Sequence, residues 1–377
     1  MRLITDSGLW VAGEETEAPP LAAVVEVSGA VLSWTIDGPP DATRITLTDP
    51  SRADWMWRVL GADGHVALAS AVDSAARSIE LTGVDIAPGS VAPLRRLALG
   101  HWLQRWWPAS RRDGVPALDR ALLDVEVALL TVGAQGFFTD DTLDSDVAEL
   151  LRPHATALIV HVRDDDARIR DLVRAGVELG DELGIDGSGW AELAAAVDDS
   201  GVVVDLPTGR RDDYALAAGA DDGADRGAQG AAPIARGVAS IKWSGVPARI
   251  FDAAEDTVDW YVEATGTAVV AAVRAAVIGP DPATGVTVLV RSGALSATGA
   301  LDADGHATLP LFDAQQRPLT ESAAWDHDWA GTSVIVGAEA SESREARERV
   351  RRWARARLNQ PSDDTYLAEI LAGESSY

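Results

Sequence analysis

Cysteine is absent from this sequence of 377 residues. Its absence excludes disulfide bonds, thiolate metal sites, iron–sulfur clusters and cysteine nucleophiles. Lysine is almost absent too, because Lys242 is the single one. A P-loop requires Gly-Lys-Ser/Thr, but Lys242 lies in Ser-Ile-Lys-Trp, so that nucleotide site is excluded. The Gly-x-Ser-x-Gly and His-Glu-x-x-His patterns are also missing. We therefore expect no cofactor and favour a protein that is not an enzyme.

Basic residues are scarce relative to acidic ones. The chain has 32 Lys and Arg against 59 Asp and Glu, which gives a net charge of −27. A field of that sign repels phosphate backbones and anionic lipid surfaces. We therefore expect partners that are neither nucleic acids nor membranes. The hydrophobic fraction of 47% is nevertheless sufficient for packed cores.

Long apolar segments are missing as well. The N-terminal residues show no apolar run followed by a cleavage site of small residues, and no stretch approaches the ~18 apolar residues of a membrane span. The longest run, residues 268–278, is interrupted by Arg274. We therefore expect neither export nor membrane insertion, and a cytoplasmic location.

Changes in hydrophobic period along the chain predict an α+β protein with several domains. An N-terminal β-rich domain precedes a central helical bundle, which is followed by an antiparallel β-sandwich with a trailing helix. The predicted segments are a β-rich domain at 1–90, a helical domain at 91–207, a flexible linker at 208–237, a β-sandwich at 238–340, and a basic helix with the C-terminal tail at 341–377.

In the first domain, Asp63-Gly64 separates two apolar segments, residues 57–60 and 66–68. Because Asp-Gly supplies the positive φ angles of tight turns, the pattern predicts a β-hairpin. Residues 60–68 also match residues 301–309 at six of nine positions. Duplicated domains or shared turn chemistry would explain the match, and nine residues do not decide between them.

The second domain has the period of helices. Leu118, Leu122, Val125 and Leu129 recur at helical spacing, and a later helix is expected to kink at Pro153. An alternative interpretation of residues 157–162 is a buried strand. Short connections between the predicted helices favour a bundle.

The segment 208–237 contains 20 Ala, Gly and Asp among its 30 residues. Such a composition buries too little apolar surface to offset the entropy lost on ordering, which predicts a flexible linker. A preceding strand is expected at 202–204. After the linker, short segments of period two without intervening helices predict the antiparallel sandwich.

The strongest local group of polar residues is Asp326-His327-Asp328, between Trp325 and Trp329. Two carboxylates beside an imidazole are suited to bind a divalent metal or to transfer protons, which suggests a metal-assisted hydrolase as an alternative function. An acidic loop capped by two tryptophans is the favoured interpretation, because no spacing of a third ligand is recognisable. A carbohydrate-binding module that uses sandwich tryptophans is a further alternative.

An aromatic cluster lies at residues 101–107. Trp102 and Trp106 share one helical face, which favours a core position, whereas Trp107 is expected to be exposed and to contact a partner.

The clearest charge feature is a helix predicted from Glu342 to Leu358, with seven arginines and a cap at Ser341. These arginines pair either with the chain's own acids or with a partner protein. In the second case we expect contacts through arginines of the helix and through apolar residues of the tail, namely Arg351, Arg352, Arg355, Ile370 and Leu371. With no catalytic set in view, the sequence favours a cytoplasmic scaffold or adaptor that binds other protein subunits.

Overall fold

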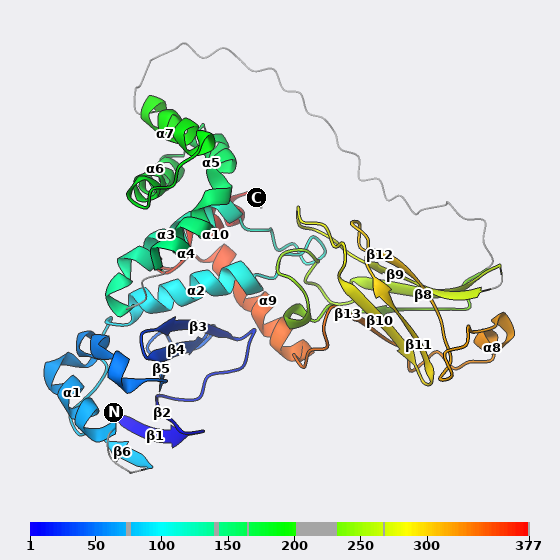
Figure 1. Ribbon diagram of the computed structural model, residues 1–377, viewed down its shortest axis with the longest axis horizontal. Coiled ribbons are helices and arrows are strands. Elements are labelled where there is room, and N and C mark those ends of the chain that lie inside the picture. Colours follow the sequence, from blue (N-terminus) through cyan, green and yellow to red (C-terminus); the bar gives the residue numbers. More distant parts are fainter. Residues whose placement is uncertain (73–76, 139–142, 164–165, 201–231, 267, 376–377) are drawn as a thin grey trace.

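The computed structural model describes residues 1–72, 77–138, 143–163, 166–200, 232–266 and 268–375. It confirms the predicted α+β class, with an N-terminal sheet, central helices and a C-terminal pair of sheets followed by helices (Figure 1). None of the described helices is long and apolar enough to cross a membrane.

The N-terminal sheet has six antiparallel strands in the order β3-β4-β5-β2-β1-β6. Their bounds are β1 Arg2–Asp6, β2 Leu9–Ala12, β3 Ala22–Val27, β4 Ala30–Thr35, β5 Arg44–Leu47 and β6 Ser78–Glu80. Trp34 and Leu32 of β4 are fully buried, and the Trp34 indole donates to Thr43 Oγ1 at 2.9 Å. Trp34 therefore lies in the core against the sheet with its indole N–H hydrogen-bonded.

The hairpin predicted around Asp63-Gly64 is wrong, because these residues lie in helix α1 (Trp57–Val72), which has a break at Gly61. Leu60, Gly64 and Leu68 are buried at a spacing of four residues, as on one helical face. A Cβ at Gly64 would approach the Val84 side chain to 3.0 Å. This glycine therefore permits close packing and forms no turn.

The two similar segments consequently differ in structure. Residues 60–68 are helical, whereas residues 301–309 include a turn in which Gly305 has a φ of 83° and Asp302 N donates to His306 O at 2.8 Å. The match does not reflect a duplicated sandwich.

The helical region contains α2 Ala92–Trp106, α3 Arg120–Gly133, α4 Leu143–Leu151, α5 Ala155–Val162, α6 Ala167–Glu182 and α7 Ser188–Ser200. Asp119 caps α3 by accepting from Leu122 N at 3.0 Å. A 3-10 turn with Pro153 separates α4 from α5, which confirms the predicted interruption. The alternative strand at 157–162 is wrong, because α5 spans these residues. The strand expected at 202–204 lies outside the described residues.

The C-terminal region is an antiparallel sandwich, as predicted. One sheet has the order β12-β9-β8-β7 and the other β11-β10-β13. Their bounds are β7 Ala235–Ala239, β8 Val258–Thr265, β9 Ala268–Ala275, β10 Thr287–Ser292, β11 Leu295–Ala300, β12 His306–Pro310 and β13 Ser333–Val336, with a short α8 at Glu321–Trp325. The linker predicted to reach Gly237 ends earlier, since β7 includes residues 235–237; residues 208–231 lie outside the described part.

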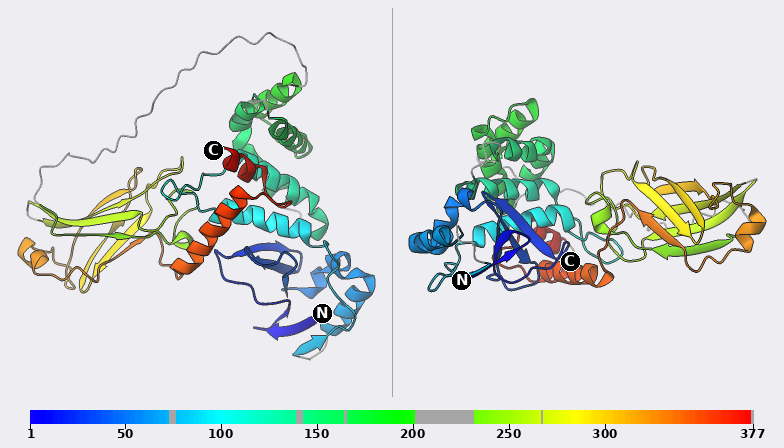
Figure 2. Two further views of the ribbon diagram at one scale, coloured as in Figure 1. Left: turned by 180° about the vertical axis from the view of Figure 1, so that it is seen from behind. Right: turned by 60° about the horizontal axis from the view of Figure 1, so that its bottom comes forward.

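After the sandwich, the chain returns to the N-terminal half through α9 (Arg344–Asn359) and α10 (Leu367–Glu374). Both views show α9 beside α2, between the N-terminal sheet and the sandwich (Figures 1 and 2). Trp353 of α9 meets Trp102 of α2 edge to face, with ring centroids 4.9 Å apart. The C-terminal segment therefore packs into the body of the protein.

Candidate functional site: the arginine-rich junction of α9

The polar residues of greatest interest lie on α9. Its cap is Ser343 and not the expected Ser341, because Ser343 Oγ accepts from Ala346 N at 3.1 Å. Three of its seven arginines are buried, at the positions Arg347, Arg351 and Arg357. Since burial of an unpaired charge is strongly unfavourable, each of these guanidinium groups needs a carboxylate partner.

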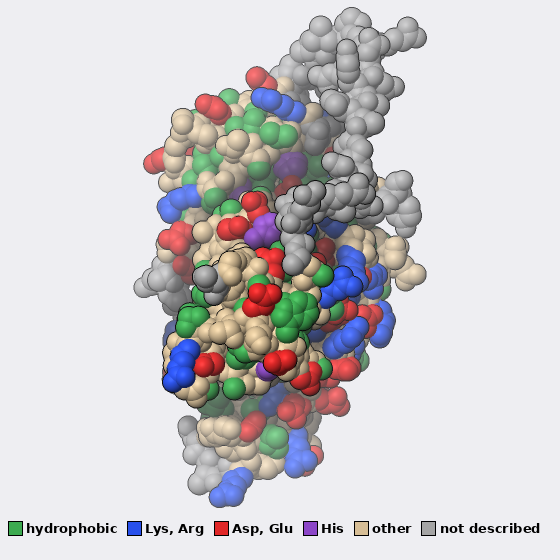
Figure 3. Space-filling model, turned by 90° about the vertical axis from the view of Figure 1, so that its right-hand side faces the viewer, with side chains coloured by type: hydrophobic (Ala, Val, Ile, Leu, Met, Phe, Trp, Pro, Cys, Tyr) green, Lys and Arg blue, Asp and Glu red, His purple; other side chains and the backbone are tan. Residues whose placement is uncertain are grey.

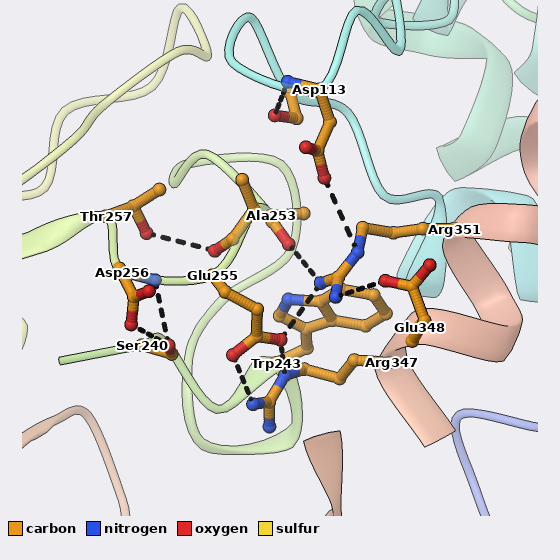
Figure 4. Close-up of polar contacts among 12 residues, drawn as sticks. Asp113, Ser240, Trp243, Ala253, Glu255, Asp256, Thr257, Arg347, Glu348 and Arg351 are labelled. Atoms are coloured by element: carbon orange, nitrogen blue, oxygen red, sulfur yellow. Dashed lines mark hydrogen bonds and ion pairs between the residues drawn. The ribbon is translucent and has the colours of Figure 1, made fainter. Parts of the chain in front are cut away.

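Arg347 and Arg351 share one carboxylate, Glu255, from the loop that leads into β8 (Figure 4). Arg347 Nε and Nη2 donate to the two Glu255 oxygens at 2.9 and 2.8 Å, and Arg351 Nη1 donates to Oε1 at 3.0 Å. Burial alone would raise the pKa of Glu255, but hydrogen bonds and the charges of these arginines lower it to about 2. The carboxylate is therefore ionised at neutral pH.

Arg351 also joins elements that are far apart in sequence. Its Nη1 donates to Ala253 O at 3.0 Å, its Nη2 to Glu348 Oε2 at 3.0 Å, and its Nε lies 3.4 Å from Asp113 Oδ2. Asp113 belongs to the loop after α2, whereas Ala253 belongs to the approach to the sandwich. One side chain thus links α9, the helical region and the sandwich (Figure 4). We call Arg347, Arg351 and the groups that they bind, together with Glu342, the junction.

Glu342, just before α9, attaches the beginning of that helix to the segment that follows β7. Its carboxylate accepts from Trp243 N, from Ser244 N at 3.0 Å and from Ser244 Oγ at 2.8 Å. The single lysine, Lys242, donates to Glu342 O at 2.8 Å. From the other side, Arg105 of α2 donates to the carbonyl oxygens of Trp243 and Val246, both at 3.0 Å. Residues 242–246 are therefore held between α2 and α9.

A second network fastens α10. Arg357 donates to both oxygens of Glu369 at 2.6 and 2.7 Å and to Asp364 Oδ1 at 2.8 Å. Arg95 of α2 also pairs with Asp364. Although burial opposes ionisation, the Ser362 hydrogen bond and these arginines hold the pKa of Asp364 well below its usual value. The buried Tyr366 hydroxyl donates to Arg96 O at 2.5 Å. The last helix is thereby attached to α2.

A cleft of about 860 Å³ lies beside the junction, lined by residues that include Arg111, Arg112 and Asp252. Asp252 accepts from Arg111 N and from Ala254 N, both at 2.9 Å, so its carboxylate shapes the loop. Arg112 Nη1 donates to the carbonyl oxygens of Glu255 and Asp256 at 3.0 and 2.8 Å. Arg112 therefore ties the loop after α2 to the segment that carries Glu255.

The Asp326-His327-Asp328 loop has a different environment. His327 Nε2 lies 2.9 Å from Ser292 Oγ, and its ring packs edge to face on Trp329 with centroids 4.6 Å apart. Asp328 accepts from Ala330 N at 2.9 Å. Within the described ranges, no three His, Cys, Asp or Glu residues form a group that could hold a metal ion. Ser292 is only 1% exposed, so this serine and histidine do not form an accessible nucleophilic pair.

The structure separates the six residues that the sequence predicts as partner contacts. The expectation of an exposed Trp107 is wrong, because this residue is 8% exposed and its indole donates to Pro116 O at 2.8 Å. Arg351 is 2% exposed and bound within the chain. Arg355 is partly exposed and pairs with Asp113 at 3.3 Å. Arg352 is exposed, and Ile370 and Leu371 are half-buried on α10.

Sequence reasoning missed the carboxylates that complete the junction, Glu255, Asp113 and Glu342. They stand in loops without helical or strand periodicity. In a chain with 59 acidic residues, a pattern of charge alone does not single them out.

The chain was compared with protein-family models, with curated proteins and with solved structures, and none of the three comparisons found a match.

The first prediction concerns the stabilising role of Arg351. Replacement of Arg351 by Ala leaves carboxylates of the junction without their partner, and we expect the free energy of unfolding to fall by about 3 kcal/mol. Arg352→Ala is the matched control, because the adjacent side chain is exposed, and it should change stability by less than about 0.5 kcal/mol. Urea unfolding measures both values. Equal stabilities of the two variants would show that the buried network does not hold the fold.

The second prediction concerns pH. The pKa of Glu255 is about 2 in the folded chain against an ordinary 4.5, so unfolded Glu255 binds a proton at a higher pH than the folded residue does. Its contribution to stability is complete above about pH 4.5 and is lost as the pH falls toward 2. The stability difference between the unaltered protein and Glu255→Gln should therefore shrink from about pH 6 to about pH 3. Urea unfolding at several pH values tests this, and a constant difference would contradict it.

Proposed function

We propose that this protein is a non-enzymatic scaffold or adaptor that acts in the cytoplasm, within a multi-protein assembly, through contacts with other protein subunits. The observation that carries the proposal is the return of α9 and α10 from the sandwich to the N-terminal half. The buried arginines of α9 join the helical region, the sandwich and α10 through carboxylates of distant segments, and the partly exposed Arg349 pairs with Asp37, just after β4 of the N-terminal sheet. A chain that fixes separate surfaces relative to one another lowers the entropic cost of binding several partners together.

The N-terminal sheet takes part in this joining. Arg349 of α9 donates to Asp37 Oδ1 at 2.8 Å and to Glu17 Oε1 at 3.0 Å. These groups are more exposed than those around Glu255, so this contact is weaker than the buried pairs. One helix nevertheless contacts all three parts of the molecule.

The two alternative functions receive less support. The hydrolase hypothesis needs a ligand set around His327, and the described residues supply none. The carbohydrate hypothesis needs exposed sandwich tryptophans, but Trp243 and Trp260 are 7% and 6% exposed. Trp325 is exposed, but it lies on α8 and not on a strand of the sandwich.

The surface of the proposed scaffold suits protein partners. Acidic side chains are spread over the end of the molecule formed by the sandwich, with basic ones between them (Figure 3). The net charge of −27 opposes nucleic acids and anionic membranes. Of the residues predicted to contact partners, four retain exposed surface for such a role, namely Arg352, Arg355, Ile370 and Leu371.

The third prediction tests the scaffold directly. In an extract of its native host, the protein should elute from a sizing column in a species larger than the purified chain of 39.6 kDa. Cross-linking mass spectrometry of that species should identify links to other proteins from both the N-terminal half and the sandwich. Elution at the position of the purified chain, without intermolecular links, would contradict the proposal.

A further inference from the structure

The outer face of one sandwich sheet carries a patch of four exposed side chains. Strands β7 and β8 pair so that Arg236 lies opposite Tyr261 and Val238 lies opposite Asp259. Because side chains alternate between the two faces of a strand, these four share one face. They stand at the corners of a quadrilateral, in which Arg236 and Asp259 form one diagonal and Val238 and Tyr261 form the other.

The opposite face of the same two strands belongs to the core of the sandwich. Trp260 is 6% exposed, and a Cβ at Gly237 would come within 2.5 Å of its ring. Figure 1 shows β8, β9 and β12 in one layer of the sandwich and β10, β11 and β13 in the other. The patch therefore lies on the side of its sheet that faces away from the second sheet.

The patch is accessible to a binding partner. Val238 is 56% exposed and Tyr261 is 40% exposed, and Arg236 and Asp259 are exposed as well. A hollow of about 580 Å³ lies over these side chains, and Gly237 is among the residues that line it. None of the four side chains forms a hydrogen bond or an ion pair with another described residue. Their polar groups are therefore free to pair with those of another molecule.

The charge of this face differs from that of the chain as a whole. On neighbouring strands, the bases Arg236 and Arg274 stand beside the acids Asp259 and Glu263. The whole chain carries a net charge of −27, so two copies repel one another over most of their surface. Because the Debye length at physiological ionic strength is about 8 Å, the charges at a contact outweigh distant ones. A face with both signs in balance is thus a place where two copies can approach.

The arrangement of the patch is complementary to itself about a two-fold axis. In a symmetric dimer, identical residues meet at the axis, and residues on its two sides exchange partners. When two such faces pack together about an axis along the diagonal from Val238 to Tyr261, Arg236 of each copy lies over Asp259 of the other. Tyr261 then contacts Tyr261 of the second copy, and Val238 contacts Val238.

The same axis also pairs the two charged residues that flank the patch. Arg274 lies next to Asp259 across the sheet, and Glu263 lies two residues beyond Tyr261 along β8. At the ordinary spacing of strands and residues, the two-fold axis brings Arg274 of each copy close to Glu263 of the other. Every charge of the face thus meets one of opposite sign.

We propose that this face is the contact of a homodimer, in which the sandwich sheets of two copies pack face to face about the two-fold axis. Tyr261 and Val238 of both copies form its apolar centre, and pairs of opposite charge surround that centre. Because few apolar side chains take part, the dimer exchanges with the monomer and is not obligate. The inference goes beyond the proposed scaffold function and does not depend on it.

The fourth prediction concerns the charges of the dimer, measured by sedimentation equilibrium of the purified full chain at increasing concentrations. Arg236→Glu places a carboxylate over Asp259 of the second copy, so the dissociation constant should rise by about tenfold or more. Asp259→Arg should weaken the dimer in the same way. The double variant Arg236→Glu with Asp259→Arg should recover it, because opposite charges face each other again. Arg352→Glu, at an exposed position of α9, makes the same change of net charge and is the matched control with unchanged dimerisation.

Position 238 offers a test that does not depend on charge. Because the chain has no cysteine, Val238→Cys introduces a single thiol beside the axis. A short bismaleimide should join two copies of this variant, whereas Val66→Cys, at a site of α1 that is 63% exposed, should stay unlinked. A nitroxide label on Val238→Cys adds bulk on both sides of the axis and should give a monomer.

Thermal unfolding establishes that each variant is folded, which is expected because the replaced side chains are exposed. An unaltered chain that sediments as a monomer at every concentration would overturn the inference. A dimer that survives Arg236→Glu, or one that the double variant fails to restore, would do the same, as would equal cross-linking at positions 66 and 238. A large native assembly together with a monomeric purified chain would reject the homodimer and leave the scaffold proposal standing.

Discussion

Burial of a guanidinium group requires a carboxylate beside it, and α9 buries three such groups. This requirement determines which parts of the chain lie together. Glu255 comes from the approach to β8, Asp113 from the loop after α2, and Glu369 from α10. Each carboxylate belongs to a different segment, so satisfying the charges of one helix also fixes the positions of the sandwich, the helical region and the last helix.

The strength of the junction follows from its geometry. Arg347 binds Glu255 through two parallel hydrogen bonds, an arrangement with more directionality than a single contact. Arg351 adds a backbone carbonyl, which ties the orientation of the loop to that of α9. Removing one partner leaves the others charged and buried, so the loss of one side chain from this network costs more free energy than the loss of one from an exposed ion pair.

Much of the architecture could be predicted from the sequence, because the spacing of hydrophobic residues differs between helices and strands. The spacing of Leu122, Val125 and Leu129 identified α3, although Leu118 lies before the cap of that helix at Asp119, and Pro153 marked the break before α5. Predictions from local sequence patterns were wrong where contacts with distant segments determine the structure. Asp63-Gly64 resembles a turn, yet both residues lie in α1, where the close approach of Val84 explains the glycine at position 64.

The junction was harder to predict than the fold. The arginines of α9 were visible as a charge pattern, and pairing with the chain's own acids was one of two interpretations. Identifying Glu255 or Asp113 as partners requires contacts between residues about 96 to 240 positions apart, which no short-range pattern encodes. Trp107 was misjudged for a similar reason, since its indole is covered by a loop that includes Pro116.

The central claim is that the arginines of α9 hold the sandwich in a fixed position relative to the N-terminal half. Because the chain has no cysteine, Val66→Cys and Val238→Cys, at sites 63% and 56% exposed, introduce two unique points for spin labels. Double electron–electron resonance between them should give one narrow distance distribution, which broadens when Arg347 and Arg351 are both replaced by Ala. A broad distribution in the labelled protein with intact arginines, or a narrow one that survives their removal, would contradict the claim.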